Sequence, residues 1–331
     1  MRLGVVAGLE AADWKDSLAK VRIAEDLGYE LVGRGEAWGT SVLPWLTLLA
    51  ANTSKIKLGP AILNCFSRSP AVMAQEIGLL DQISDGRMVM GLGSSGNQVI
   101  EHFHGVPFER PVQRLREYTE IFNILIAGDA LNYEGELYHL ERGFKLDYNR
   151  PRTKIPVYIA AITPKSIVQT GEIADGIYPI HWPKAHFGGL RAQLDTASTG
   201  AGREAGSVTI APFTNVYVTD GSNDDMQWLV ARAPLHFYIN RMGSFYWQML
   251  SREGFEAEVG ASRQAWAARD KDASLDAITR EMVAEIQVVG PIDSVREQLQ
   301  ERSALGAELQ MVQMPPGDTA AVGAYLESLL R

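Results

Sequence analysis

The stretch Gly91–Gly96 reads G-x-G-x-x-G, the spacing of the turn that binds the pyrophosphate of NAD in dinucleotide-binding proteins. In those proteins the glycines follow a strand and open a helix, and an acidic residue about 20 positions later holds the ribose. The apolar run Arg87–Met90 supplies the strand, but Pro107 and Pro111 break any early helix, and no apolar strand with a terminal acid lies near position 115. We therefore expect these glycines to serve a turn or a close approach of the backbone, without NAD.

Two ionisable side chains stand at the ends of predicted strands, where they could transfer protons. Glu36 is the only carboxyl group at six such ends, which makes it the first candidate for a proton donor or acceptor; the alternative is a structural ion pair with Arg34 or Arg68. His181 directly follows another predicted strand, and we expect it in the pocket, with simple packing as the alternative. Both residues are candidate catalytic residues.

The other strand ends carry glycine, alanine, hydroxyl and amide residues, and the sequence has no H-E-x-x-H and no G-x-S-x-G motif. His102 and His104 flank Phe103 in a predicted loop, where we expect packing, so no metal site is predicted. Such neutral strand ends favour a pocket for a large flat cofactor that performs the chemistry itself. Thr163, followed by Pro164, is expected to cap a helix and to leave free amides that could bind a phosphate.

The composition narrows the class of protein. The chain has 331 residues and a net charge of −9, which argues against a nucleic-acid partner. The single cysteine, Cys65, excludes an internal disulfide and favours the cytoplasm. No apolar run is long enough to span a membrane, and the early acids Glu10, Asp13 and Asp16 argue against a signal peptide.

Short apolar strands alternate with amphipathic helices along the whole chain, and eight strands with helices between them predict a (β/α)8 TIM barrel. A doubly wound sheet is the alternative, because local patterns do not reveal closure. We expect one domain over 1–331, with a hairpin inserted after strand 4 at about 129–153 and a helical insertion after strand 7 at about 224–288. The predicted strands cover residues 3–8, 29–37, 55–64, 86–93, 155–161, 175–182, 207–220 and 308–315.

The helices are predicted from apolar residues at helical spacing and from their end signals. Ser69 is expected to cap the helix that Pro70 opens. In the helical insertion, Tyr238, Tyr246 and Trp247 are expected to pack between helices rather than to form a wall of the substrate site. The helices are predicted at 13–28, 41–53, 69–84, 112–127, 163–174, 186–199 and 319–330.

Several stretches resemble one known family over nearly the whole chain. "LGPAILNCFSRSPAVMAQEIGLLDQISDGRMVMGLG", "FHGVPFERPVQRLREYTEIFNILIAG", "YEGELYHL", "PVYIAAITPKSIVQTGEIADG" and "VVGPIDSVREQLQERSALGAE" follow one another in this order. Together they resemble the luciferase-like superfamily of flavin- and deazaflavin-dependent oxidoreductases. The resemblance is greatest to the branch that uses coenzyme F420 and includes methylenetetrahydromethanopterin reductase.

This resemblance implies a barrel, a homodimer, and a non-prolyl cis peptide at Ala61–Ile62 behind the cofactor ring. The chain departs from the family pattern at the end of strand 2, where some relatives have an acid followed by histidine and this chain has Glu36 and Ala37. Some reductases also have a glutamate in strand 1, where this chain has Val6. The expected cofactor-binding residues are Ala61, Ile62, Asn64, Gly91, Gly93, Ser94, Asn97, Ala161, Ile162, Thr163, Lys165 and Ile180.

These observations predict an oxidoreductase that transfers a hydride between F420 and a small organic substrate. Arg68, Lys165 and Lys184 are expected near the pocket mouth, where they could bind the anionic tail of the cofactor. One alternative is an FMN-dependent monooxygenase that uses reduced flavin and oxygen. A second alternative is a barrel that binds a ligand without catalysis.

Overall fold

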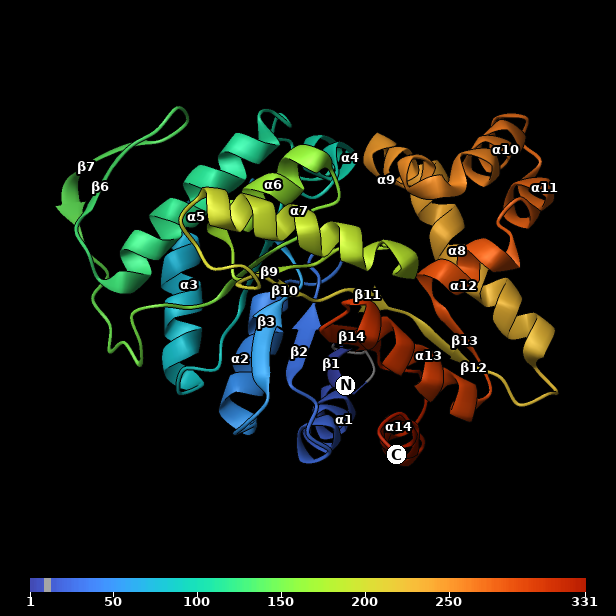
Figure 1. Cartoon of the computed structure of the whole chain (residues 1–331). Coiled ribbons are helices and arrows are strands. Elements are labelled where there is room, and N and C mark those ends of the chain that lie inside the picture. The colour runs from blue at the N-terminus through green and yellow to red at the C-terminus, as the bar shows by residue number, and fades with distance from the viewer. Residues whose placement is uncertain (9–12) are drawn as a thin grey trace.

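The computed structural model describes residues 1–8 and 13–331, so the predicted acid Glu10 lies outside the described residues. Its strands lie at the centre and most helices surround them (Figure 1). Two five-stranded parallel sheets have the orders β11-β14-β1-β2-β3 and β10-β9-β8-β5-β4. The strands are β1 (Arg2–Val6), β2 (Leu31–Arg34), β3 (Lys57–Pro60), β4 (Leu63–Asn64), β5 (Met90–Gly93), β8 (Val157–Ile159), β9 (Gly176–Ile177), β10 (Thr209–Ile210), β11 (Phe213–Thr214) and β14 (Leu309–Gln313).

The two sheets contact each other at two places. A bridge between Leu58 and Met88 connects β3 to the residues that lead into β5. On the other side, β10 and β11 follow each other along the chain, and β10 pairs with β9 whereas β11 pairs with β14. All strands of both sheets run parallel, so their carboxyl ends lie at one edge, as the sequence predicts.

The helices between these strands follow the predicted pattern. Ser69 caps α3 as predicted, since its hydroxyl accepts a hydrogen bond from the Val72 amide. Asp13 caps α1 in the same way. These helices are α1 (Trp14–Asp26), α2 (Val42–Asn52), α3 (Pro70–Ile83), α5 (Pro111–Ala127), α6 (Pro164–Ile173), α7 (Phe187–Gly200), α13 (Ile292–Leu305) and α14 (Thr319–Ser328), with a 3-10 turn, η1 (Lys184–His186), before α7.

One helix contradicts the sequence prediction. The short helix α4 (Asn97–His102) begins directly after Gly96, although we expected the prolines that follow to break any early helix. Both prolines lie beyond its end, and its Val99 and Ile100 are buried, so tertiary packing stabilises a helix too short to form alone.

Two segments stand outside the central strands. The predicted hairpin is present as β6 (Leu131–Glu134) and β7 (His139–Phe144), which project at one side in Figure 1. The helical region contains α8 (Asp224–Arg241), α9 (Ser244–Leu250), the π-helical turn η2 (Ser251–Phe255), α10 (Glu256–Ala267), α11 (Lys271–Asp276) and α12 (Arg280–Ile286), at the opposite side in Figure 1. Strand β12 (Val216–Val218), within the strand predicted at 207–220, pairs with the unpredicted β13 (Val288–Gly290) and so joins the two ends of this region.

Two glycines allow the backbones of β3 and β5 to approach each other closely. A Cβ atom added at Gly59 would lie 2.4 Å from the Val89 carbonyl oxygen, and one at Gly91 would lie 1.9 Å from the Pro60 carbonyl oxygen. Neither position therefore tolerates a side chain without movement of the backbone. Gly91 serves strand packing, a role that local sequence does not distinguish from ligand contact.

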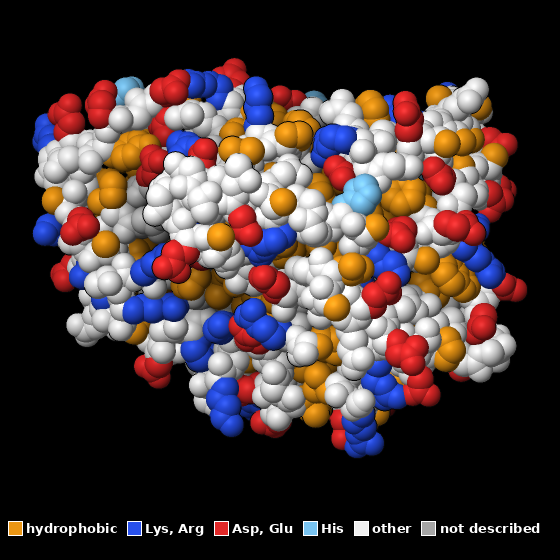
Figure 2. Space-filling view, viewed as in Figure 1, with side chains coloured by type: hydrophobic (Ala, Val, Ile, Leu, Met, Phe, Trp, Pro, Cys, Tyr) orange, Lys and Arg blue, Asp and Glu red, His pale blue; other side chains and the backbone are white. Residues whose placement is uncertain are grey.

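The surface and the described residues have three further features. Basic and acidic side chains intermingle over the face in Figure 2, without a basic stripe. Within residues 1–8 and 13–331, no helix is long and apolar enough to cross a membrane. The same residues contain no group of three or more His, Cys, Asp or Glu side chains placed to hold a metal ion.

Candidate active site

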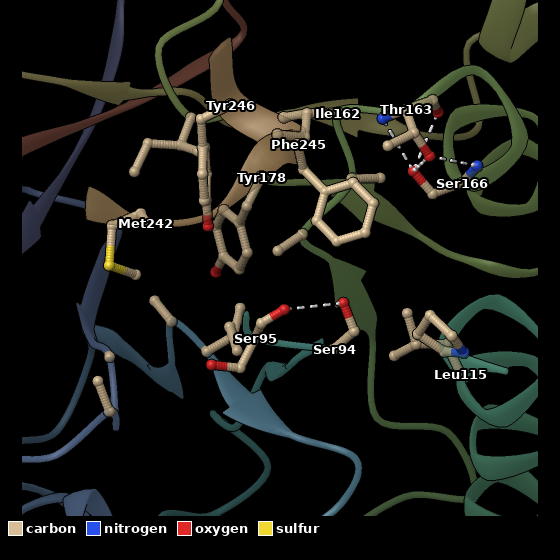
Figure 3. Close-up of a pocket in the computed structure, with 18 of the residues that line it drawn as sticks. Ser94, Ser95, Leu115, Ile162, Thr163, Ser166, Tyr178, Met242, Phe245 and Tyr246 are labelled. Atoms are coloured by element: carbon tan, nitrogen blue, oxygen red, sulfur yellow. Dashed lines mark hydrogen bonds between the residues drawn. The ribbon is translucent and has the colours of Figure 1, made fainter. Parts of the chain in front are cut away.

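A pocket of about 330 Å³ opens at the carboxyl ends of the strands, between them and helices α5, α8 and α9 (Figure 3). This volume lies within the range of small-molecule sites, roughly 300–1,000 Å³. The strand ends contribute mostly small residues together with Tyr178 and Phe213, and the helices contribute Leu115, Tyr238, Phe245 and Tyr246 among others. The lining comprises Gly35, Glu36, Ala37, Ala61, Ile62, Ser94, Ser95, Pro111, Val112, Leu115, Ala160, Ala161, Ile162, Thr163, Ser166, Tyr178, Ile180, Phe213, Tyr238, Met242, Phe245 and Tyr246.

Glu36 lines the pocket and forms an ion pair with Arg68. The Arg68 Nη1 atom lies 2.6 Å from Glu36 Oε1 and Nη2 lies 3.3 Å from Oε2, while the Val42 amide donates to Oε2 at 2.9 Å. Burial alone would raise the pKa of Glu36, but the hydrogen bonds from Arg68 and Val42 outweigh it and lower the pKa. At neutral pH Glu36 is therefore ionised, which suits a proton acceptor better than a donor.

His181 lies behind the pocket wall and is absent from the lining. It is 4% exposed, and its ring packs edge-on against Tyr238 with centroids 4.6 Å apart. Burial lowers the pKa of His181 to about 4, so the imidazole is neutral at neutral pH. Its Nε2 atom has no hydrogen-bond partner within the described part of the chain. The structure thus separates the two candidate catalytic residues, because only Glu36 reaches the pocket.

The end of the third predicted strand forms the floor of the pocket. The Ala61–Ile62 peptide bond is cis, as the resemblance implies, and both residues line the pocket. A Cβ atom at Gly93 would lie 2.9 Å from Ile62 Cδ1, so the absence of a side chain at Gly93 makes room for Ile62. Gly91 and Gly93 therefore shape the floor without lining the pocket.

The two asparagines in the predicted set lie outside the pocket lining. Asn64 is buried, and its Oδ1 atom accepts hydrogen bonds from the Phe66 and Ser67 amides at 3.0 Å and 2.8 Å. This pattern shapes the loop after β4. Asn97 is exposed at the start of α4. The remaining predicted residues in the lining are Ser94, Ala161, Ile162, Thr163 and Ile180.

The N-terminus of α6 offers fewer free amides than the sequence predicts. The Ser166 amide donates to Thr163 Oγ1 at 3.3 Å, and the Thr163 amide donates to Ser166 Oγ at 3.1 Å, as Figure 3 shows. This capping box satisfies two donors, and Pro164 has none. The exposed Lys165 has a backbone amide and an ammonium group at this helix end that could bind an anion.

The three predicted tail-binding cations differ in their surroundings. Arg68 pairs with Glu36 and also with Glu76, and Lys184 pairs with Glu301 at 2.8 Å. Arg68 and Lys184 therefore already have acidic partners that lie far from them in the sequence. The sequence interpretation also missed Arg252 of η2, whose Nη2 atom donates to the Ile162 carbonyl at 2.9 Å beside Thr163.

The aromatic wall of the pocket contradicts a further prediction. Tyr238 and Tyr246 line the pocket, although we expected both only to pack between helices. Their rings contact each other edge-on, with centroids 4.6 Å apart, and Phe245 lies next to them in the lining. Tyr178, which directly follows β9, also belongs to the lining, and Figure 3 shows its ring beside that of Tyr246. Only tertiary packing brings these side chains together, so no local signal marks them.

The comparisons with known proteins agree with this architecture. Residues 1–309 match the model of the luciferase-like monooxygenase family. The chain is 29% identical over 306 residues to 5,10-methylenetetrahydromethanopterin reductase of Archaeoglobus fulgidus, covering 90% of this chain and 89% of that protein. It is 31% identical over 218 residues to an F420-dependent glucose-6-phosphate dehydrogenase of Microbacterium testaceum, covering 61% and 64%.

A solved structure shares the fold. The coenzyme F420 dependent tetrahydromethanopterin reductase from Methanopyrus kandleri superposes with a TM-score of 0.82 at 23% identity, over 100% of this chain and 99% of that one. The fold, the pocket at the strand ends and the match over most of the chain lead to one conclusion. The chain belongs to the luciferase-like monooxygenase family.

Proposed function

We propose that this protein is an oxidoreductase that uses coenzyme F420 and acts on a small organic molecule. The observation that carries the proposal is a ligand-sized pocket at the strand ends whose one carboxylate is ion-paired and whose other lining side chains are neutral. Such a pocket binds and orients but does not attack, so a cofactor must supply the reactivity. Relatives over most of the chain are named as F420-dependent enzymes or as a reductase.

The residues of the pocket fit a flat ring with an anionic tail. The small side chains of Ala61, Ala160 and Ala161 leave room for a ring. For a phosphate of the tail we propose Lys165, two positions after the lining residue Thr163, and Arg252, which pairs with Glu253 and donates to the carbonyl of the lining residue Ile162. F420, when bound, supplies a carbon that accepts or donates a hydride.

The chain's own residues would bind, orient and exchange a proton. We assign the proton acceptor to Glu36, since it lines the pocket and is ionised. His181 stays a second candidate, which packs behind the lining residue Tyr238. The cofactor-binding set stays as predicted from the resemblance. Within it, Gly91, Gly93 and Asn64 would act by shaping the strands and loops that bear the other residues.

The pairings of the strands support a closed (β/α)8 barrel in one domain over 1–331. Two connections would close the ring. One is the bridge between Leu58 and Met88, and the other is the passage of the chain from β10, which pairs with β9, to β11, which pairs with β14. The β6–β7 hairpin and the α8–α12 region would then be its insertions. We further propose a homodimer through α3, which exposes Val72, Leu79 and Ile83 along its length, and a cytoplasmic location.

The family description favours one other function, a monooxygenase, for which FMN would be the cofactor. A single phosphate needs fewer cations than the tail of F420, and the capping box at Thr163 leaves few donors. A monooxygenase would need oxygen and a supply of reduced flavin, whereas the proposed hydride transfer needs neither.

Deuterium transfer without oxygen tests the proposal. Reduced F420 with deuterium at C5 is incubated with the protein and a panel of small ketones, imines and activated alkenes. We expect a product with one deuterium on the reduced carbon, detected by mass spectrometry. Turnover only with FMN and oxygen would replace the proposal by the monooxygenase, and cofactor binding without turnover of any compound would favour the ligand-binding barrel.

A further inference from the structure

The pocket has two ends, and the cofactor tail proposed above would use one of them. Figure 3 shows Thr163 and Ser166 at one side of the pocket and Met242, which directly follows α8, at the other side. The tail phosphate is proposed at the Thr163 end, beside Lys165 and Arg252. The end marked by Met242, called the α8 end below, therefore remains open to a second ligand.

Three side chains form a rim beside the α8 end. Trp38 and Phe237 have ring centroids 6.5 Å apart, and the guanidinium carbon of Arg241 lies 5.5 Å from the Phe237 centroid. Phe237 and Arg241 are four positions apart on α8 and so lie on one face of the helix. Each rim residue is the sequence neighbour of a residue that lines the pocket, namely Ala37, Tyr238 and Met242.

The rim exposes an apolar surface next to the pocket. Trp38 is 54% exposed although tryptophan side chains are mostly buried in proteins. Its ring forms a tilted pair with Phe237, which is itself only partly buried. A ligand that covers these two rings removes apolar area from water and gains aromatic contacts, so the rim favours a ligand with a ring.

The rim also holds a cation without an acidic partner. In the described ranges 1–8 and 13–331, no acidic side chain pairs with the exposed Arg241, whose guanidinium packs over Phe237. Arg68 and Arg252, in contrast, are each paired with a glutamate. Among the described lining residues Glu36 alone is charged, so an anionic group is disfavoured inside the pocket and finds its partner at Arg241.

We propose that the rim of Trp38, Phe237 and Arg241 binds the substrate, and that the substrate is a carboxylate that bears an aromatic ring. The ring covers Trp38 and Phe237, the carboxylate pairs with Arg241, and the uncharged reacting carbon extends into the pocket. This inference rests on the proposed function, because it names the substrate class of the same site. It leaves the floor at Ala61 and Ile62 to the ring of the cofactor.

Two matched probes test the substrate class. Butyrophenone and 4-oxo-4-phenylbutanoate share a phenyl ketone and differ at the end of the chain, which is a methyl group in one and a carboxylate in the other. Their affinities for the F420-saturated protein are measured by calorimetry. We expect the carboxylate to bind about 5-fold more tightly at low salt, with a smaller preference at high salt. Equal affinities, a preference for butyrophenone, or no binding of either probe would overturn the proposal.

Two variants test the rim residues. Arg241→Gln should abolish the preference for the carboxylate and leave butyrophenone binding unchanged. Trp38→Ala should weaken both probes by about 5-fold. The matched controls are Lys145→Gln and Phe144→Ala, which alter an exposed cation and an exposed aromatic ring at the hairpin, on the opposite side of the molecule from α8 in Figure 1. Both controls should bind the probes as the wild type does.

Unchanged probe affinities in Arg241→Gln and Trp38→Ala would refute the role of the rim. If either variant does not fold, judged by circular dichroism, the two probes on the unaltered protein still decide the proposal. F420 affinity is measured on every variant by fluorescence titration and should equal that of the wild type. If Arg241→Gln or Trp38→Ala weakens F420 as much as the probes, the cofactor tail occupies the rim and the proposal is overturned.

Failure of the proposed function gives a different result. If the wild type does not bind F420, the proposed function fails, and the two probes are then compared on the cofactor-free protein. A preference for the carboxylate there that Arg241→Gln abolishes supports the rim as a binding site, and the absence of a preference overturns it. If F420 binds and the carboxylate is not preferred, the substrate class is wrong and the cofactor assignment stands.

Discussion

Replacement of Arg68 by methionine should destabilise the protein in a pH-dependent way. Arg68 and Glu36 are joined by two contacts of 2.6 and 3.3 Å, and their side chains are 17% and 9% exposed. Removal of one partner from a buried ion pair costs about 3–5 kcal/mol, and the partial exposure of this pair places Arg68→Met near the lower limit. Methionine retains much of the volume of the side chain, so the loss reports on charge rather than on packing.

The sign of the pH dependence follows from the pKa of Glu36. In the native protein this pKa is lowered, so the ion pair contributes fully above the unfolded value of 4.5 and is lost as the pH falls through the folded pKa. Without Arg68, burial is opposed only by the hydrogen bonds from Val42 and Ser41, so the pKa of Glu36 rises relative to the native protein. The penalty in Arg68→Met should therefore be full at pH 7 and decrease as the pH falls and Glu36 takes up a proton.

Urea unfolding at pH 7 and at pH 5 measures both effects. The double variant Arg68→Met/Glu36→Gln is the matched control, since it removes the uncompensated charge and should recover most of the lost free energy of unfolding. An Arg68→Met protein as stable as the wild type at pH 7, or equally destabilised at both pH values, would refute this reasoning. Failure of the double variant to recover stability would show that packing of Arg68, not charge, is lost.

Three further outcomes are expected. Glu36→Gln should lower kcat by about 10²–10⁴-fold with F420 affinity nearly unchanged, measured by steady-state kinetics and fluorescence titration; an unchanged kcat would leave Glu36 a structural role. Gly91→Ala should lower the free energy of unfolding by about 1–3 kcal/mol, because its Cβ would meet the Pro60 carbonyl oxygen; a protein as stable as the wild type would contradict this packing. Glu117→Gln should loosen the β6–β7 hairpin, since this buried carboxylate accepts hydrogen bonds from the amides of residues 136–138. Amide hydrogen exchange in the hairpin should become faster, and exchange at the wild-type rate would contradict this expectation.

The strands and most helices could be predicted from the sequence because their signals are local. The cap at Ser69 and the apolar run before Gly91 determine structure within a few residues. Helix α4 was missed because the burial of Val99 and Ile100 stabilises it. Strand β13 was missed because its partner strand β12 is far away in the sequence: the first residue pair, Val216 with Val288, is 72 positions apart. Periodicity carries no information on such distant contacts.

The candidate site was predicted in outline and not in its electrostatics. Glu36 was found because it follows a strand, but its pairing with Arg68 was one of two alternatives and only the tertiary structure decides between them. The sequence placed Thr163 at a helix end, whereas the reciprocal hydrogen bonds with Ser166 that occupy the amides depend on side-chain conformation.

The most direct test of the central claim is a titration of the protein with F420 and with FMN, in oxidised and reduced forms. The wild type is compared with Ala160→Trp, which would fill the pocket, and with Lys165→Ala at low and high salt. We predict that F420 binds more tightly than FMN, that salt and Lys165→Ala weaken F420 more than FMN, and that a folded Ala160→Trp protein binds neither. Tight binding of FMN without binding of F420, or F420 binding that survives in Ala160→Trp, would contradict the account.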